Sequence, residues 1–216
     1  WCRYLVPLPK SIEISSKVVL DGPYVAVVGP AGGDKITGQA VNELRESIGS
    51  NYENQPAPGA QFTIEMTLGG HEADRLKSLK NSEQAYSITP VGDSVLRITA
   101  LTSRGLYYGS KTLQQLIRAP RTVDKVEIPL LTVTDWPDLE ERGLWGGDSA
   151  MNIEWLADRK MNVTENISAR NVTRDGRGQS GPKDYWENAP TEGPIRGFNV
   201  VPAVLHLEQI AGPYKD

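Results

Sequence analysis

The chain has 216 residues, 38% of them hydrophobic, which is enough for one large domain or two modest ones. Its net charge of −4 provides no basic excess to neutralise phosphates, and this argues against a nucleic-acid partner. The single cysteine, Cys2, excludes an internal disulfide and a cysteine-based metal site, and no apolar run is long enough to span a bilayer. We expect neither a cofactor nor a metal ion.

The chain up to residue 135 begins with segments that favour β-structure. Short runs of β-forming residues at 12–14 and 17–20 predict extended structure near the amino terminus. Residues 23–28 are largely apolar, which predicts a strand buried on both faces.

Two amphipathic helices are expected in the same part of the chain. Between residues 36 and 48 the apolar residues recur at helical spacing, with Asp34 or Thr37 as the cap and Gly49 as the stop. A second helix is expected after Ser103, where leucine and isoleucine residues again recur at helical spacing.

Three further strands are predicted around these helices. Residues 62–66 alternate between apolar and polar, as in a half-exposed strand. Residues 85–88 and 94–101 are interpreted as a hairpin that turns at Gly92-Asp93. Residues 128–131 are interpreted as a lead into the segment that follows. The expected order is β-β-α-β-β-β-α, an α+β domain of one sheet and two helices.

The rest of the chain has a different pattern. A short strand is expected at 142–147, a helix at 153–157, and further strands at 162–169 and 197–205. Strand, helix, strand, connection, strand is the beginning of a βα series. A complete (β/α)₈ barrel takes about 250 residues, so we expect residues 136–216 to form an incomplete segment of an α/β (TIM-type) barrel.

Three segments together resemble a known family. Residues 5–10 (Leu-Val-Pro-Leu-Pro-Lys) resemble the opening of the domain that precedes the barrel in family 20 β-N-acetylhexosaminidases. Residues 103–116 are similar to the last helix of that domain, which has a GxxYGxxTLxQL pattern. Residues 135–138 (Asp-Trp-Pro-Asp), with Arg142-Gly143 after them, resemble the entry into the first barrel strand. The resemblance covers roughly residues 4–165.

The resemblance implies a fold and an activity. It implies an α+β domain at 1–135, zincin-like in that family, and the first βα units of the catalytic barrel at 136–216. It implies hydrolysis of terminal N-acetylhexosamine residues from glycans, with retention, in which the substrate's acetamide attacks the anomeric carbon. The Asp-Glu pair that supports this chemistry in the family is absent from these residues. We therefore expect no catalytic residue here, and no activity from this chain alone.

Four residues are candidate substrate contacts, because barrel chemistry takes place at the carboxyl ends of the strands. Trp145 can stack on a sugar ring or fill the barrel core, and Asp148 can bind a sugar or cap the next helix. Glu165 is a polar contact if the strand register points it into the site. His206 follows the third strand and can bond a sugar hydroxyl.

Other functions remain open at this point. The arginine that follows the first-strand aspartate in the family is missing after Asp148, which leaves room for a related glycosidase, α-glucuronidase-like or endo-acting. A non-catalytic carbohydrate-associated module is a further alternative. The expected partner is a glycan that contains N-acetylhexosamine. The resemblance implies an extracellular, periplasmic or cell-surface location, although residues 1–4 do not resemble a signal peptide.

Overall fold

The computed structural model describes residues 2–21, 25–49, 59–118, 125–144, 152–172, 178–180 and 189–205. The chain divides into two compact units. The first contains Trp1–Glu140 together with Asp158–Lys160, and the second contains Glu141–Ala157 and Met161–Asp216.

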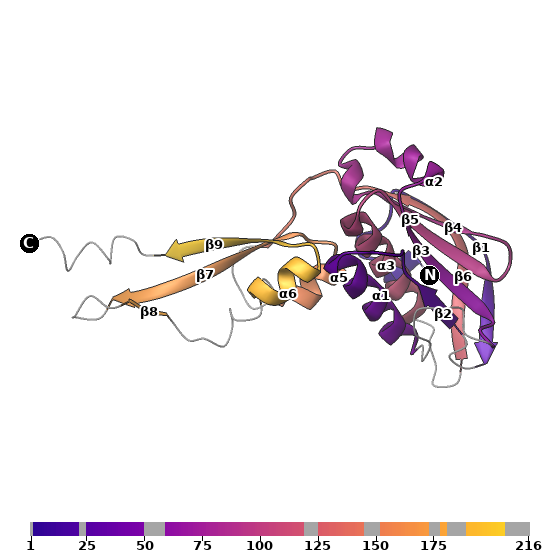
Figure 1. The fold of residues 1–216 in the computed structure, drawn as a ribbon, viewed down its shortest axis with the longest axis horizontal. Helices are drawn as coiled ribbons and strands as arrows, with labels where there is room; N and C mark the ends of the chain where they lie inside the picture. The colour runs from indigo at the N-terminus through magenta and orange to yellow at the C-terminus, as the bar shows by residue number, and fades with distance from the viewer. Residues whose placement is uncertain are drawn as a thin grey trace, which may run out of the picture. The chain divides into compact units, whose positions relative to one another are not determined.

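The first unit is built on a six-stranded mixed sheet (Figure 1). The strands are β1 (Ser11–Asp21), β2 (Val25–Val28), β3 (Phe62–Leu68), β4 (Tyr86–Pro90), β5 (Val95–Ala100) and β6 (Lys125–Asp135). They lie in the order β1-β6-β4-β5-β3-β2. The β2–β3 and β3–β5 pairs are parallel, and the β1–β6, β4–β6 and β4–β5 pairs are antiparallel. The predicted α+β architecture of this part of the chain is confirmed.

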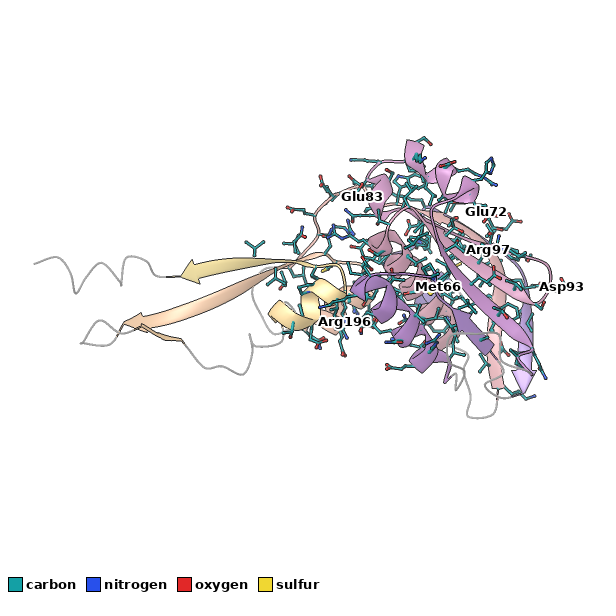
Figure 2. All side chains as sticks on the ribbon, viewed as in Figure 1. Met66, Glu72, Glu83, Asp93, Arg97 and Arg196 are labelled. Atoms are coloured by element: carbon teal, nitrogen blue, oxygen red, sulfur yellow. The ribbon has the colours of Figure 1, made fainter. Side chains whose placement is uncertain are left out.

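Two long helices, α1 (Lys35–Ile48) and α3 (Ser103–Arg118), pack against each other and cover one face of this sheet (Figure 1). The strand side chains that face them are apolar and buried, and Met66 lies among them (Figure 2). This core includes Ile64, Met66, Ile88, Ile98 and Val133 from the strands, and Ala40, Leu44, Leu113 and Leu116 from the helices. The burial of these alternating strand residues is the main force that holds the helices on the sheet.

Helix α1 has the two caps that its sequence predicts. The Asp34 carboxylate accepts a hydrogen bond from the Thr37 backbone N–H at 2.9 Å, and its second oxygen accepts one from the Ser103 hydroxyl at 2.7 Å. Gly49 ends the helix in the left-handed conformation, with φ of 69°. Asp34 thus caps α1 and also ties its start to the start of α3.

Replacing Asp34 by Ala is expected to lower the free energy of unfolding by about 1 kcal/mol, the usual value of a lost N-cap. Partial burial acts against the Asp34 carboxylate, but hydrogen bonds from Thr37 and Ser103 outweigh it and lower its pKa below 3.8. The stabilisation is therefore present above that pH and is lost as the pH falls through the lower folded-state pKa. Urea unfolding at pH 7 and near pH 3 should show the difference from wild type shrink in acid, whereas equal differences would contradict this assignment.

In the first sheet, two of the predicted β-forming runs are parts of one strand, and one prediction needs correction. Residues 12–14 and 17–20 belong to a single strand, β1, whose register shifts between Ile14 and Ser16. Residues 128–131 lie in a full strand, β6, and do not merely lead to the junction. Pro129 lies inside β6, although a proline cannot donate to the ladder. It is tolerated because the described β4 pairing of β6 covers only residues 133–135, so Pro129 has β1 alone as its neighbour.

The hairpin prediction is confirmed, and short helical segments were missed. Strands β4 and β5 pair antiparallel, and Gly92 takes the positive φ of 68° that their turn requires (Figure 2 labels Asp93 beside it). The missed elements are η1 (Cys2–Tyr4), α2 (His71–Asp74), η2 (Arg75–Ser78) and η3 (Ser82–Gln84). Each has three or four residues, too few to show a helical period in the sequence.

The second unit contains a three-stranded sheet in the order β8-β7-β9. Its elements are α5 (Ile153–Asp158, whose last residue belongs to the first unit), β7 (Val163–Val172), β8 (Gly178–Ser180), α6 (Ala189–Ile195) and β9 (Asn199–Leu205). Strands β7 and β9 are parallel, with α6 between them in the sequence. The predicted helix near 153–157 and the strands near 162–169 and 197–205 are confirmed.

Two details of the second unit differ from the sequence expectation. Residues 142–144 form no regular strand, and residues 145–147 lie outside the described part of the chain. The segment that forms helix α6 was expected only as a connection. Its sequence Ala-Pro-Thr-Glu-Gly-Pro-Ile contains two prolines and a glycine, which are unfavourable in a helix interior. Gly193 is needed there, because a Cβ would lie 2.8 Å from a methyl carbon of Val200 on β9.

Candidate functional site

The described residues include only one of the four predicted substrate contacts. Trp145, Asp148 and His206 lie outside the described residues, so their roles stay predictions. Glu165 is the third residue of β7 and lies opposite Val201 of β9 in the parallel register. Its backbone is therefore near the amino end of the strand, whereas barrel chemistry takes place at the carboxyl ends.

In the second unit, three chain segments meet around Asn162. The side-chain oxygen of Asn162 accepts a hydrogen bond from Arg142 N at 2.7 Å. The Asn162 backbone N–H donates to Arg142 O at 2.8 Å. The Asn162 carbonyl accepts a bond from Asn199 N at 2.7 Å. A Cβ on Gly143 would lie 2.4 Å from Val163 O, so only glycine permits this approach. Residues 142–143 therefore run beside the start of β7, and β7 runs beside β9.

In the first unit, the aspartate of the Asp-Trp-Pro-Asp segment lies in a buried polar network. The Lys160 ammonium lies 3.0 Å from Asp135 Oδ2 and donates to Tyr86 Oη at 2.7 Å. Tyr86 Oη donates to the same Asp135 oxygen at 2.8 Å and lies 2.6 Å from the Thr112 hydroxyl. Because the single phenol proton goes to Asp135, Thr112 is the donor in the last contact. The other Asp135 oxygen accepts from Lys10 N at 3.1 Å.

This network has a structural role. Burial, and after it the nearby Asp135 carboxylate, raises the pKa of the Tyr86 phenol well above its usual value of 10.0, so the phenol stays protonated as a donor. Lys160 is 5% exposed and Asp135 7%. Both charged groups are therefore almost fully removed from solvent. The hydrogen bonds of the network stabilise the buried ion pair between Lys160 and Asp135.

A second buried ion cluster lies on helix α3. Lys111, whose side chain is 4% exposed, pairs with Glu43 of α1 at 2.6 Å and with Asp158 at 2.8 Å. The Tyr107 hydroxyl donates to the same Glu43 oxygen at 2.9 Å. Arg118 reaches Asp158 at 3.3 Å. The two carboxylates compensate the buried ammonium, which would otherwise be costly.

In the pattern that resembles the family's last helix, both glycines and Gln115 have a packing explanation. A Cβ on Gly105 would lie 2.4 Å from Ala85 O, and one on Gly109 would lie 2.5 Å from a methyl carbon of Ile98. These two glycines therefore let α3 lie directly on β4 and β5. On the polar side, the Gln115 side-chain oxygen accepts from Val6 N, and its NH₂ donates to Val6 O and to Asp158 O.

The segment after β6 is also held by side chains of the first unit. Asn81 donates to Pro137 O at 2.9 Å, and Gln84 donates to Glu140 O at 2.9 Å. Lys10 forms an exposed ion pair with Asp138 at 2.5 Å, which lowers the pKa of that carboxyl. The Asp-Trp-Pro-Asp segment is thus fixed along its length.

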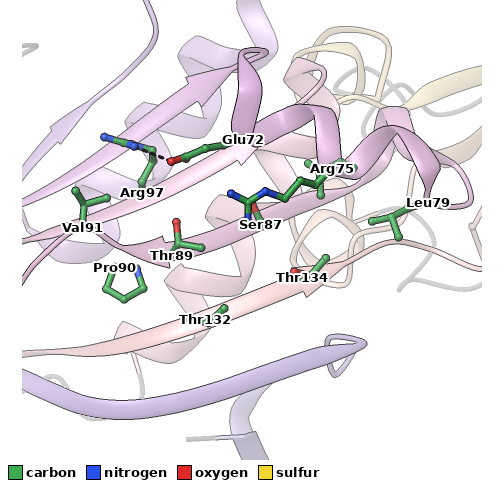
Figure 3. A pocket seen from close by; sticks show the side chains of 11 residues that line it. Glu72, Arg75, Leu79, Ser87, Thr89, Pro90, Val91, Arg97, Thr132 and Thr134 are labelled. Carbon is green, nitrogen blue, oxygen red and sulfur yellow. Dashed lines mark hydrogen bonds and ion pairs between the residues drawn. The ribbon is translucent and has the colours of Figure 1, made fainter.

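The outer face of the first sheet carries a groove of about 460 Å³ (Figure 3). It lies between strands β4 to β6 and the α2–η2 segment. The lining residues are mostly polar or charged: Glu72, Arg75, Leu76, Leu79, Ser87, Thr89, Pro90, Val91, Arg97, Thr132 and Thr134. Across the residues that the structure describes, no group of His, Cys, Asp or Glu side chains is arranged to hold a metal ion.

The family model described as "Glycosyl hydrolase family 20, domain 2" matches residues 3–136. The chain belongs to glycosyl hydrolase family 20. The resemblance to this family is therefore confirmed, and the match includes the segments 5–10 and 103–116 that prompted it. The domain-2 match contains both buried networks except Asp158 and Lys160, and it also contains the groove on the outer face.

Solved structures of this family share the fold at low identity. A chitobiase of Flavobacterium johnsoniae is 19% identical with a TM-score of 0.66, covering 98% of this chain and 36% of that one. A β-N-acetylhexosaminidase from Bacteroides fragilis is 18% identical with a TM-score of 0.63, covering 98% and 47%. An exo β-N-acetylglucosaminidase from Vibrio harveyi, solved with N-acetylglucosamine, is 16% identical with a TM-score of 0.61, covering 94% and 36%.

This chain spans less than half the length of each of these three structures. No protein with a curated description matches the chain by sequence. The helices within the described ranges include none that is long and apolar enough to cross a membrane.

The buried networks and the groove were not foreseen from the sequence. Lys111 and Lys160 each occur near apolar residues, which in retrospect indicates buried cations, but nothing local identifies their partners in α1 or β6. The groove lining comes from three strands and a short helical segment, and only the strand register brings these residues together.

Proposed function

We propose that the chain is the N-terminal portion of an exo-acting β-N-acetylhexosaminidase that releases terminal N-acetylhexosamine residues from glycans. The observation that carries the proposal is the family 20 match over residues 3–136. It is supported by the fold shared with a chitobiase and with enzymes described as acting on β-N-acetylhexosamines. In this proposal residues 1–135 form the domain that precedes the catalytic barrel.

Residues 136–216 are proposed to open that barrel. In a (β/α)₈ barrel, successive strands are parallel neighbours joined by helices. The β7–α6–β9 unit has this form, and residues 142–143 lie beside the start of β7, as a preceding strand would. These three neighbours follow one another in chain order, which supports the proposal.

The proposed chemistry is substrate-assisted hydrolysis with retention, as in the family generally. Its Asp-Glu pair is absent from these residues, so no residue here is assigned a catalytic role. Trp145, Asp148 and His206 remain proposed sugar contacts, and Glu165 remains one with a less favourable backbone position. An extracellular or periplasmic location stays part of the proposal.

The proposal is tested by comparing this chain with the product of its complete reading frame. The longer product is expected to hydrolyse 4-nitrophenyl N-acetyl-β-D-glucosaminide and to release the β-anomer first, as NMR can follow. The 216-residue chain alone should give no rate above buffer.

A longer product inert toward both N-acetylglucosaminide and N-acetylgalactosaminide substrates would contradict the proposal. If that product still bound N-acetylhexosamine, it would favour the alternative of a non-catalytic carbohydrate-associated module. Release of internal fragments or of uronic acid would favour an endo-acting or α-glucuronidase-like enzyme.

A further inference from the structure

The groove on the outer face of the first sheet has an unusual set of hydroxyl groups. In the strand register, Ser87 of β4 lies between Thr134 of β6 and Thr99 of β5. Thr99 is buried, and its hydroxyl lies 3.0 Å from that of Thr67. Ser87 and Thr134 instead face the groove, as do two further threonines from β4 and β6 (Figure 3).

These four groove hydroxyls are available to a ligand. They belong to Ser87, Thr89, Thr132 and Thr134. Within the described ranges, none of the four makes a side-chain hydrogen bond to protein, and each residue is at least partly exposed. A row of such groups at fixed strand spacing matches the alternating hydroxyls of a sugar chain better than it matches an apolar ligand. The nearby apolar side chains of Leu79 and Val91 can contact the C–H faces of sugar rings.

The charges at the groove are unequally compensated. Arg97 pairs with Glu65 at 2.9 Å and with Glu72 at 3.2 Å, and the Glu65 hydrogen bond raises the pKa of Arg97 above its usual range. For Arg75, the described residues include no carboxylate within ion-pair distance. In Figure 3, Glu72 is turned toward Arg97, while Arg75 extends over the strands toward Ser87.

We propose that this groove binds an acidic oligosaccharide, with Arg75 pairing the anionic group and the four hydroxyls bonding the sugar. A guanidinium presents two parallel donors that fit a carboxylate or a sulfate. The volume of about 460 Å³ lies in the range of small-molecule sites. An anion approaching from the Ser87 side meets Arg75 first and avoids Glu72, whose charge is turned toward Arg97. This site goes beyond the proposed hydrolase activity and does not depend on it.

The test is isothermal titration calorimetry of the 216-residue chain with three probes. They are an oligogalacturonate tetrasaccharide, a chondroitin sulfate tetrasaccharide and neutral chitotetraose. Binding of the oligogalacturonate shows that a carboxylate is sufficient as the anionic group. Binding of the chondroitin probe alone shows that the oligogalacturonate carboxylates are not sufficient. At least one anionic probe is expected to bind, and the neutral probe should bind more weakly. The affinity for the anionic probe should fall with added salt, because salt screens the charge pair.

Two variants make the test specific to the groove. Arg75→Gln is expected to lower the affinity for the anionic probe at least about tenfold, because a charge-assisted hydrogen bond is lost. Lys77→Gln removes the same charge from the same η2 segment, but Lys77 pairs with Asp74 and does not line the groove, so its affinity should stay near wild type. Failure of both anionic probes to bind, equal binding of chitotetraose, or equal loss in the two variants would overturn the proposal.

Discussion

Replacement of Asp135 by Asn is expected to lower the free energy of unfolding by about 3–5 kcal/mol, the usual cost of leaving one member of a buried ion pair without its partner. In the native structure the Asp135 carboxylate accepts from the Lys160 ammonium, the Tyr86 phenol and the Lys10 backbone N–H. An amide NH₂ in the place of Oδ2 would face two donors. The buried Lys160 ammonium would then lose the carboxylate with which it pairs.

A matched control lies three residues further along. Asp138→Asn removes an identical charge from the same Asp-Trp-Pro-Asp segment, but its ion pair with Lys10 is exposed and should contribute little. Urea unfolding followed by circular dichroism should therefore show a large shift of midpoint for the first variant and a small one for the second. Similar midpoints for the two variants would show that the buried network does not stabilise the fold.

Replacement of Gly105 by Ala is expected to lower the free energy of unfolding by about 1–3 kcal/mol, as overpacking in a core does. Intrinsic helix propensity acts in the opposite direction, since Ala is favoured over Gly by about 1 kcal/mol. The contact decides the sign, because the new Cβ would lie 2.4 Å from the carbonyl oxygen of Ala85. That oxygen belongs to backbone next to β4 and cannot rotate away as a side chain could.

The control is the corresponding change in the other helix. Gly38 of α1 is exposed, and a Cβ there meets no atom within 4 Å, so Gly38→Ala should stabilise the domain by about 0.5–1 kcal/mol. Thermal unfolding of the two variants should therefore move in opposite directions. A stable Gly105→Ala variant would mean that α3 can move off the sheet at no cost.

The parts of the fold that could be predicted from the sequence depend on local patterns. The caps of α1 at Asp34 and Gly49, and the turn at Gly92, are recognisable within a few residues of sequence. The strand β6 pairs with residues of β1 that lie more than 100 positions earlier in the chain. The proline inside β6 is a residue that strands usually avoid. Pairing of this kind is invisible to any short window, so β6 was misread.

The site was less predictable than the family. The residues that prompted recognition, such as Gly105, Gly109 and Gln115, serve to pack one helix against a sheet, and they are confirmed as family features without revealing a substrate. The predicted sugar contacts Trp145 and Asp148 stay predictions. Groove residues such as Arg75 carry no sequence signature, because their proximity arises only from tertiary structure.

The contacts of Asp158 have a consequence for how α3 can vary. Its carboxylate and carbonyl are bound by Lys111, Gln115 and Arg118, which recur along one side of the helix, while Gly105 and Gly109 lie against the strands. An α-helix turns about 100° per residue. One inserted or deleted residue between the glycines and Gln115 would rotate the polar side of the helix by about 100° relative to its glycines. If the glycines kept their contacts with the strands, Lys111, Gln115 and Arg118 could not all reach Asp158. The length of the helix between these positions is therefore fixed, and most of its other side chains are buried as well.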